Sequence, residues 1–553
     1  GLTVVVSPLI ALMHDQVDRL RDNGIAAAFI NSSMSSQERA RREQAALRGE
    51  LKLLYVAPER LLSEGFLELL DRIKERVGLS LLAIDEAHCI SEWGHDFRPE
   101  YRKIVQVRRR YPDLPVLCLT ATATERVRED IVRQLALKDH YLHVASFNRP
   151  NLYYDVRTKD KRSFAELLGL LEEDPQAPVI VYCQSRKSVE QLAERLSESG
   201  IKALPYHAGL GATERSEHQD RFIRDDVAVL VATVAFGMGI GKPDVRAVVH
   251  YDLPRNLEGY YQESGRAGRD GQPAKCILYF SHGDRAKVEY MIAQKSDLDE
   301  QRIARQQLNQ VVAYAESTVC RRRIQLGYFG EALAGQNCGN CDNCLSPVLT
   351  EDRTVDAQKL LSCVARCKER FGMRHIVDVL RGADTERIRA RGHDQLSTYG
   401  IGKERGDDEW MRLGRALLHQ GLLTETTDGY PVLKLNPLAW EVLRGQRNVH
   451  IAAAPVAQPK PPASPKQERA VTSTPDLEPV DEILFQQLRQ LRKRLADAQG
   501  VPPYVVFPDA TLRAMAQQRP QSEAEFLAIP GVGQRKLDAY FADFTGAIRT
   551  VLP

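Results

Sequence analysis

Short apolar runs separated by helical patterns dominate residues 1–146. The runs are LTVVVSP, LKLLYVAP, LSLLAIDE and LPVLCLTAT, and amphipathic stretches lie between them. Strands that are apolar at nearly every position are typical of a parallel sheet with helices on both faces. We therefore expect residues 1–146 to form an α/β lobe.

The same pattern restarts after FNRPN (147–151) and continues to residue 285. Its apolar runs are APVIVYCQS, IKALPYHAG, VAVLVATVA, VRAVVHYD and AKCILYF. Parallel sheets bind ligands at the carboxyl ends of their strands, so loops of both lobes can face a shared cleft. The pattern thus predicts two tandem α/β lobes, 1–146 and 147–285.

The remaining residues lose the strand pattern. Residues 286–347 read as helical and end in a cysteine cluster, and 348–450 read as a compact helical unit that closes with a hairpin at Asp428-Gly429. Residues 451–478 carry six prolines between Pro455 and Pro475, which predicts a linker. Residues 479–553 have the length of one small helical domain. The fold class is therefore multidomain α/β with an α-helical C-terminal part.

Composition narrows the class of protein. Apolar residues make up 43% and charged residues 27% of the chain, and no apolar run approaches the roughly 18 residues that a membrane helix needs. With no leader pattern at its start, we expect a cytoplasmic protein without a membrane partner. The net charge of +2 does not decide whether it binds nucleic acid, but basic residues bunch in RKIVQVRRR (102–110) and CRRR (320–323). These runs suit phosphates, and a solvated helix face explains each of them equally well.

Four of the ten cysteines cluster in the sequence. Cys320, Cys338, Cys341 and Cys344 give the pattern C-x17-C-x2-C-x2-C, which suits a closed tetrahedral Zn²⁺ site. Disulfides or chance clustering are the alternatives, and a reducing compartment disfavours the first. We interpret the four thiols as ligands of a structural zinc ion.

Two carboxylates follow the apolar run LLAIDEAH. Asp85 and Glu86 stand at the carboxyl end of a predicted strand, where Asp85 would hold Mg²⁺ through its water shell and Glu86 would deprotonate the water that attacks a phosphate. An acidic helix start is the alternative interpretation. SPLIALMHDQ (7–16) and LTATAT (119–124) also run from a strand into a polar turn, although turn chemistry alone explains each of them.

The stretch YYQESGRAGRDG (260–271) supplies the opposite charge. Arg266 and Arg269 are three residues apart, so both can point toward a γ-phosphate from the second lobe. Glycines among them allow close backbone approach. A solvated glycine-rich turn is the alternative, but the stretch occurs together with VATVAFGMGIGKPDV (231–245) and YHAGL (206–210).

The order of these motifs resembles superfamily 2 helicases, and specifically the RecQ family of DNA helicases. DEAHCISEWGHDFRPEY resembles the Walker B residues and aromatic-rich loop of that family, VATVAFGMGI its motif V and QESGRAGRDG its motif VI. The resemblance implies two RecA-like lobes, with Gly239 and Gln262 joining Asp85, Glu86, Arg266 and Arg269 around ATP. It also implies that Trp93, Phe97 and Arg98 sense single-stranded DNA, and that His88 links that loop to the catalytic site. Exposed aromatic residues can stack on bases, whereas a core position for Trp93 is the alternative.

The resemblance implies a function as well as a fold. It implies an ATP-dependent helicase that moves 3′ to 5′ and acts in recombination and repair, with ATP, Mg²⁺ and Zn²⁺ as cofactors. The expected partners are single-stranded DNA and single-strand/duplex junctions, with single-strand-binding protein as a candidate partner. We expect a monomer that is associated with the nucleoid.

The C-terminal half resembles two further domains of that family. Residues 348–450 resemble its winged helix, with RGHDQLSTYGIG (391–402) near a candidate recognition helix. A generic helical domain remains the alternative. Residues 479–553 resemble its HRDC domain, in which Tyr504, Arg535 and Lys536 are candidate DNA contacts. Core packing is an equally good interpretation of Tyr504.

One expected motif is missing from the chain. An ATP-driven motor usually carries G-x-x-x-x-G-K-[ST], and GMGIGKP (237–243) departs from that pattern at Pro243 and in its spacing. Because the chain opens with Gly1 directly into a strand, we expect that a preceding segment with the phosphate-binding loop is absent. Two hypotheses follow: a helicase that lacks its first segment, or a DNA-binding and annealing module without ATPase activity. An RNA helicase of the DEAD-box kind is the third, and the cysteine cluster and HRDC segment argue against it.

Overall fold

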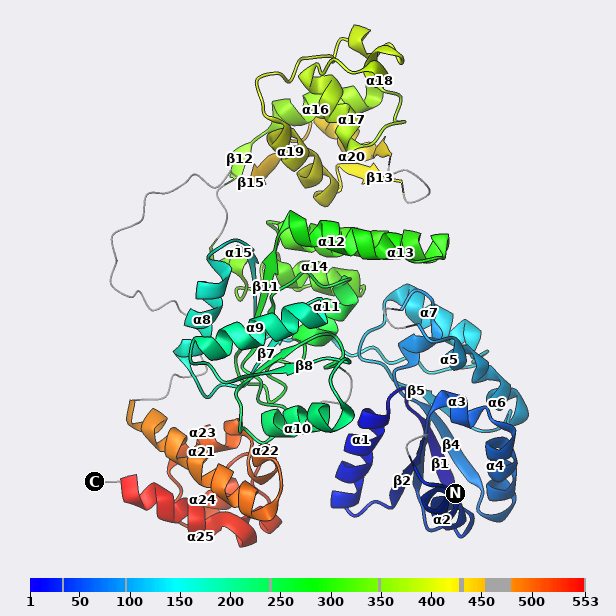
Figure 1. Cartoon of the computed structure of the whole chain (residues 1–553), viewed down its shortest axis with the longest axis vertical. Coiled ribbons are helices and arrows are strands. Elements are labelled where there is room, and N and C mark those ends of the chain that lie inside the picture. The colour runs from blue at the N-terminus through cyan, green and yellow to red at the C-terminus, as the bar shows by residue number, and fades with distance from the viewer. Residues whose placement is uncertain are drawn as a thin grey trace.

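The computed structural model describes residues 1–31, 34–94, 97–237, 241–346, 350–426, 432–452 and 479–551. Two α/β lobes occupy its centre and one side, a small α/β unit lies at one end, and a helical unit lies against lobe 2 (Figure 1). Gly239, Asp428 and Gly429 lie outside the described residues, as does nearly all of the predicted linker.

Lobe 1 is built on a parallel sheet of order β2-β3-β1-β4-β5. Its strands are β1 (Leu2–Val6), β2 (Ala27–Ile30), β3 (Leu53–Val56), β4 (Leu79–Ile84) and β5 (Val116–Cys118). Its helices are α1 (Ile10–Asp22), α2 (Ser36–Leu47), α3 (Pro58–Leu61), α4 (Glu64–Arg76), the 3-10 helix η1 (Ala87–Ile90), α5 (Pro99–Lys103), α6 (Val105–Arg110) and α7 (Glu125–Gln134). Separate hydrophobic clusters cover the two faces of the sheet, as the apolar strand pattern predicts.

Lobe 2 is built on a parallel sheet of order β6-β11-β10-β7-β9-β8. Its strands are β6 (Leu152–Thr158), β7 (Val179–Tyr182), β8 (Ala203–Tyr206), β9 (Val229–Ala232), β10 (Ala247–His250) and β11 (Ala274–Phe280), and its helices are α8 (Ser163–Glu173), α9 (Arg186–Glu198), α10 (Ala212–Ile223) and α11 (Leu257–Ser264). Strands β7, β9 and β10 are buried at every position, because alternate side chains enter different hydrophobic clusters on the two faces.

The cysteine region, residues 286–346, shares its core with lobe 2. It contains most of α12 (His282–Ala293), then α13 (Leu298–Glu316), α14 (Arg321–Tyr328) and α15 (Asp342–Leu345). Cys320 and Cys341 belong to the same buried cluster as Leu152, Tyr154 and other core residues of lobe 2. The region therefore packs as an extension of the second lobe.

Residues 350–452 form a compact unit with its own core. Its elements are β12 (Thr350–Asp352), α16 (Thr354–Arg366), α17 (Met373–Arg381), α18 (Glu386–Arg389), η2 (His393–Gln395), α19 (Asp407–His419), β13 (Leu423–Glu425), β14 (Leu433–Leu435), α20 (Pro437–Leu443) and β15 (His450–Ala452). β13 and β14 form an antiparallel hairpin, and β12 pairs with β15 so that the first and last strands close the unit. Helices followed by a hairpin agree with the predicted winged helix.

The C-terminal helical unit packs on lobe 2. Its helices are α21 (Pro479–Gln499), α22 (Pro503–Val506), α23 (Asp509–Gln518), α24 (Glu523–Ala528) and α25 (Gln534–Val551). Lys493 donates to the carbonyl of Arg224 and pairs with Asp226 at 2.8 Å, and Arg492 lies 3.7 Å from Asp225. Charge contacts between α21 and lobe 2 thus hold the unit in place.

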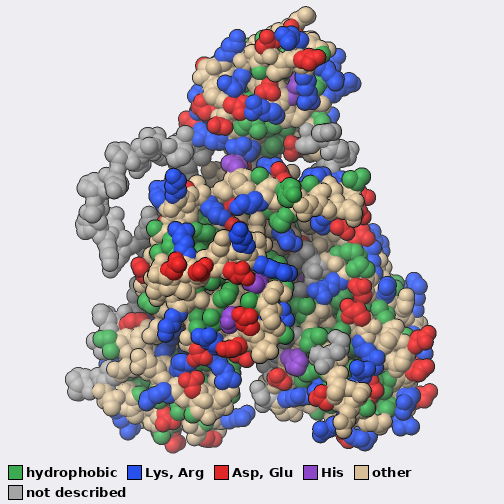
Figure 2. Space-filling model, viewed as in Figure 1, with side chains coloured by type: hydrophobic (Ala, Val, Ile, Leu, Met, Phe, Trp, Pro, Cys, Tyr) green, Lys and Arg blue, Asp and Glu red, His purple; other side chains and the backbone are tan. Residues whose placement is uncertain are grey.

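No helix in the described ranges is both long enough and apolar enough to cross a membrane. Acidic and basic side chains are intermixed on the face shown in Figure 2, as the small net charge of +2 suggests.

Candidate nucleotide and DNA site

The acidic half of the candidate site lies directly after β4. Asp85 Oδ2 accepts a hydrogen bond from Gln16 Nε2 at 3.0 Å, and Asp85 Oδ1 accepts one from the backbone N–H of Glu86 at 3.0 Å. The hydroxyl of Tyr101 donates to the Asp85 carbonyl at 3.2 Å. These contacts fix the direction of the Asp85 carboxylate before any cation arrives.

Glu86 has an unusual backbone conformation. Its φ and ψ are 49° and 46°, the left-handed region that a residue with a side chain seldom adopts, and such residues cluster at functional sites. The turn brings the Glu86 carboxylate to 3.3 Å from Nδ1 of His88. The strained backbone turn at Glu86 therefore sets the direction of its carboxylate.

His88 connects the acidic residues to the LTATAT turn. The side chain is fully buried in η1, and its Nδ1 lies 2.9 Å from the hydroxyl of Thr120, which follows β5. Thr120 also donates to the carbonyl of Thr122 at 3.2 Å. His88 of DEAH thus contacts Thr120 of LTATAT, although 32 residues of sequence separate the two positions.

The aromatic-rich loop starts two residues after η1. Arg98 donates to the carbonyl of Pro8 at 2.9 Å, which ties the loop to the SPLIALMHDQ segment. Trp93 is half-buried against the lobe 1 core, and the guanidinium of Arg126 lies 3.1 Å from its ring centroid. The guanidinium of Arg102 lies 4.9 Å from the ring of Phe97. An arginine therefore covers one face of each ring.

The basic half of the candidate site follows α11 in lobe 2. Arg266 is buried beside Tyr182, and Arg269 is exposed. Burial raises the pKa of Tyr182 to about 12, although the charge and hydrogen bond of Arg266 oppose that rise. The hydroxyl of Tyr182 donates to the carbonyl of Phe236 at 2.7 Å, so Tyr182 connects motif V with Arg266 of motif VI. Gln262 lies on α11 one turn before Arg266.

Four sulfur atoms converge in the cysteine region. The sulfurs of Cys320, Cys338, Cys341 and Cys344 all lie within 4.8 Å of one another. Four sulfur donors at this separation can converge on one ion, and the thiolate is the form that binds metal. The donor set fits a tetrahedral Zn²⁺ ion with no open position.

The basic run CRRR (320–323) fits neither phosphate binding nor a solvated helix face. Arg321 pairs with Asp342 at 3.0 Å, Arg322 is buried against backbone carbonyls of residues 149–152, and Arg323 is exposed. Two of its three guanidiniums are therefore internal, and the run is neither a phosphate patch nor a solvated face.

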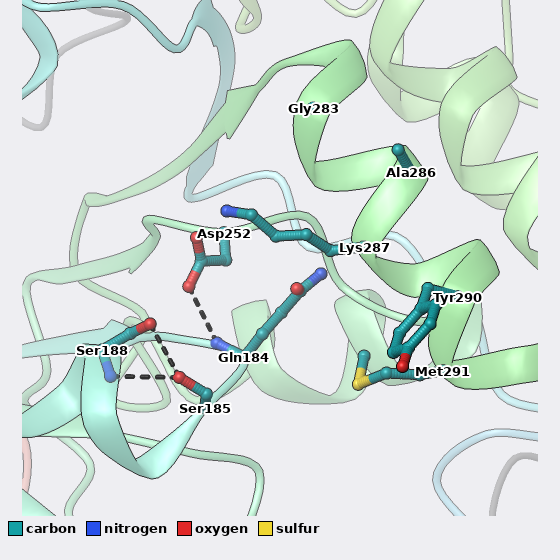
Figure 3. A pocket seen from close by; sticks show the side chains of 9 residues that line it. All are labelled: Gln184, Ser185, Ser188, Asp252, Gly283, Ala286, Lys287, Tyr290 and Met291. Carbon is teal, nitrogen blue, oxygen red and sulfur yellow. Dashed lines mark hydrogen bonds between the residues drawn. The ribbon is translucent and has the colours of Figure 1, made fainter. Parts of the chain in front are cut away.

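A pocket of about 570 Å³ opens at the carboxyl edge of the lobe 2 sheet. Gln184 and Ser185 follow β7, Asp252 follows β10, and Tyr290 lies on α12 at the opposite wall (Figure 3). The backbone N–H of Gln184 donates to Asp252 at 2.9 Å. The strand ends at this edge thus offer hydroxyl, amide and carboxylate groups, whereas Arg266 and Arg269 do not line the pocket.

The candidate DNA contacts of the C-terminal unit lie around one edge of its core. Arg535 is exposed in the first turn of α25, the ammonium of Lys536 lies 5.0 Å from the ring of Phe507, and Tyr504 is half-buried in α22. Burial lowers the pKa of Lys536. In the other small unit, residues 391–402 precede α19, the candidate recognition helix.

Sequence reasoning missed several residues that position the site. Gln16 ends a quoted motif, and Thr120 lies inside another, so both could have been inferred as partners of Asp85 and His88. Tyr101 likewise ends the quoted stretch DEAHCISEWGHDFRPEY, but nothing in that stretch indicated that its hydroxyl contacts the Asp85 carbonyl. Arg149 and Asn151 lie in FNRPN, which served only as the boundary between the lobes, and nothing in the sequence indicated that their side chains contact the arginine segment.

Comparison with known proteins agrees with this arrangement. Family models match along nearly the whole chain: DEAD/DEAH box helicase at residues 1–131, helicase conserved C-terminal domain at 162–271, RecQ zinc-binding at 282–345, RQC domain at 347–460 and HRDC domain at 481–548. The ATP-dependent DNA helicase RecQ of Pasteurella multocida is 42% identical over 99% of this chain and 85% of its own length. The proteins of the same name from Haemophilus influenzae and Bacillus subtilis are 41% and 39% identical, over 99% and 98% of this chain and 87% and 88% of their own lengths. The chain therefore belongs to the RecQ family of ATP-dependent DNA helicases.

Proposed function

We propose that this protein is an ATP-dependent DNA helicase that couples ATP hydrolysis to 3′ to 5′ movement on single-stranded DNA and to duplex unwinding in recombination and repair. The observation that carries the proposal is the network of Asp85, Glu86, His88 and Thr120 at the strand ends of lobe 1. The network is followed in sequence by the loop that carries Trp93 and Phe97. The same segment can therefore connect ATP hydrolysis with binding of a DNA strand.

The lobe 1 residues would divide the chemistry. Asp85, oriented by Gln16, would hold the water shell of Mg²⁺, and that ion would supply charge compensation for the phosphates. Glu86 would accept the proton of the attacking water. His88 contacts the Glu86 carboxylate and is followed by the aromatic-rich loop, so it is suited to report strand binding to the general base.

The lobe 2 residues would complete the ATP site. Arg266 and Arg269 would balance the charge that develops on the γ-phosphate. Gln262 of α11 is proposed as a further nucleotide contact, as is Gly239 of motif V, which lies outside the described residues.

Single-stranded DNA would follow the aromatic-rich loop. Trp93, Phe97 and Arg98 are proposed to contact it, with Tyr504, Arg535 and Lys536 as secondary contacts of the HRDC domain. The winged helix and HRDC domain suit a junction between single-stranded and duplex DNA. We further propose that the protein works as a monomer near the nucleoid and meets single-strand-binding protein on its substrate.

Zn²⁺ would act as a structural ion. Cys320, Cys338, Cys341 and Cys344 supply four sulfur ligands and leave no coordination position for substrate. The ion would cross-link α14 to the segment around α15, both of which pack on lobe 2.

The test compares ATP hydrolysis and unwinding on defined nucleic acids. The protein is assayed with single-stranded DNA, with RNA, and with duplexes that carry a 3′ or a 5′ tail. We expect hydrolysis that DNA stimulates far more than RNA, and unwinding of the 3′-tailed duplex. Annealing without DNA-stimulated hydrolysis would favour the binding-module hypothesis, and stimulation by RNA alone would favour an RNA helicase.

A further inference from the structure

The segment that carries Arg266 and Arg269 is held by a residue from outside its own helix. Helix α11 ends at Ser264, so the carbonyls that follow have no helical N–H partners. Arg149, from the FNRPN segment between the lobes, donates from Nη1 to Gly265 O at 3.3 Å and from Nη2 to Ala267 O at 3.1 Å and Gly268 O at 2.8 Å. One guanidinium therefore spans the backbone from just before Arg266 to just before Arg269.

Asn151 reinforces the same contact. Its Nδ2 donates to Gly268 O and Gln272 O, each at 2.8 Å. Gly268 has φ of 53°, and a Cβ at this position would lie 2.5 Å from Asn151 Nδ2. The glycine between the two arginines is thus required by both its backbone conformation and the approach of Asn151.

The FNRPN segment is itself held from the cysteine region. Arg322 Nη2 donates to Arg149 O at 3.1 Å and to Leu152 O at 2.6 Å, and Asn340 Nδ2 donates to Pro150 O at 3.0 Å. Arg322 stands two residues after Cys320, and Asn340 lies between Cys338 and Cys341. The backbone of residues 149–152 is consequently fixed on the side opposite to the arginine segment.

We infer that Arg149 is a positioning residue for ATP hydrolysis: it holds the backbone of residues 265–268 so that Arg266 and Arg269 face the γ-phosphate. The inference rests on the proposed function and adds a residue that contacts neither substrate nor metal. Asn151 supports it, and Arg322 and Asn340 fix the chain on which Arg149 stands.

A positioning role and a purely structural role for Arg149 differ in the expected effect of its loss on hydrolysis relative to stability. The far end of the segment has a separate anchor, because Arg246 pairs with Asp270 at 2.6 Å and the Gly268 N–H donates to Val245 O at 2.9 Å. Loss of Arg149 should therefore shift the arginines without unfolding the lobe. Since a displacement of about 1 Å can cost about 100-fold in rate, hydrolysis should respond much more than stability.

The test uses Arg149→Ala and Arg149→Lys in the product of the complete reading frame, with single-stranded DNA present. Arg157→Ala is the matched control, because Arg157 is a half-buried arginine on the adjacent strand β6 that pairs with Asp155 at 2.8 Å. We expect kcat of Arg149→Ala to fall about 10- to 100-fold with KM for ATP changed less than about threefold. Lysine should restore part of kcat, since one ammonium cannot replace two nitrogens that donate in fixed directions.

Two further measurements separate positioning from folding. The melting temperature of Arg149→Ala should stay within about 3 °C of wild type, while hydrogen exchange of residues 264–272 should rise. In a double-mutant cycle, Arg149→Ala and Arg269→Ala together should lower kcat by less than the product of their separate effects, because Arg149 acts in part through Arg269.

The outcomes also separate the two proposals. If Arg269→Ala abolishes hydrolysis but Arg149→Ala resembles Arg157→Ala in kcat, the positioning role is wrong and the proposed function stands. If Arg269→Ala hydrolyses ATP like wild type, the proposed function itself is wrong. Unchanged exchange at residues 264–272 in Arg149→Ala would overturn the inference whatever the rates are.

Discussion

The two halves of the candidate ATP site are held in different ways. The acidic half in lobe 1 is fixed by its own lobe: Gln16 of α1 and Tyr101 of α5 contact Asp85, and Thr120, which follows β5, contacts His88. The basic half in lobe 2 has one anchor in its own lobe, the Arg246–Asp270 pair, and a second in Arg149, whose backbone is held by Arg322 of the cysteine region. Distant changes should therefore disturb the arginines while they leave the carboxylates in place.

The largest effect is expected when the metal site is removed. Cys341→Ser should lose zinc and lower the melting temperature by about 10 °C or more, because Cys341 is buried in the lobe 2 core and loss of a structural metal is among the most destabilising changes. Metal content and calorimetry measure it. Cys118→Ser, at a half-buried cysteine of lobe 1, is the control, and a Cys341→Ser protein with full zinc and an unchanged melting temperature would contradict the account.

A change in α14 tests the connection more finely. Arg322→Ala removes the donor to Arg149 O and Leu152 O, so kcat should fall about 3- to 10-fold and exchange should rise at residues 149–152 and 265–268. The neighbouring exposed arginine provides the control, Arg323→Ala. Equal kinetics for the two variants would show that the cysteine region does not reach the arginine segment.

A change in lobe 1 should stay local. Gln16→Ala removes the hydrogen bond to Asp85 Oδ2, so we expect kcat to fall about threefold at saturating Mg²⁺ and the Mg²⁺ requirement to rise. Exchange of residues 264–272 should not change. Gln44→Ala on the exposed side of α2 controls for the substitution, and a rise in exchange in lobe 2 would break the distinction between the halves.

The smallest effect is expected at the HRDC contact. Lys493→Ala removes the ion pair with Asp226 and the bond to Arg224 O, neither of which touches the halves of the site. Exposed ion pairs contribute little, so kcat should remain within about twofold while exchange rises around residues 224–226. A large loss of hydrolysis would mean that this domain controls the site.

Sequence patterns predicted the elements that are apolar at nearly every position and missed those that are not. β6 was missed because Tyr153, Asp155 and Arg157 interrupt its apolar positions at the edge of the sheet. β2 was missed because it is four residues long and half alanine, a residue with low strand preference. The parallel lobes and the helical C-terminal unit were predicted correctly.

The candidate site also contains residues that the sequence identified and contacts that it did not. Residue types that carry chemistry, such as Asp85, Glu86 and the four cysteines, could be identified from motifs, because spacing along the chain reflects one turn or one metal site. The contacts of Arg149 with residues 265–268 could not, because they join positions more than 110 residues apart and no local pattern encodes such pairing. The inward direction of Arg321 and Arg322 was hidden for the same reason. The domain boundaries and the DNA-contacting side chains stay predictions.

The most direct test of the account asks whether the two halves form one ATP site. Hydrolysis of ATP by the product of the complete reading frame is measured with and without single-stranded DNA for wild type, Glu86→Gln and Arg269→Ala, with DNA binding followed in parallel. The account predicts that DNA stimulates the wild type and that each substitution lowers kcat by about 100-fold or more while DNA binding remains. Hydrolysis that survives either substitution at the wild-type rate would contradict it.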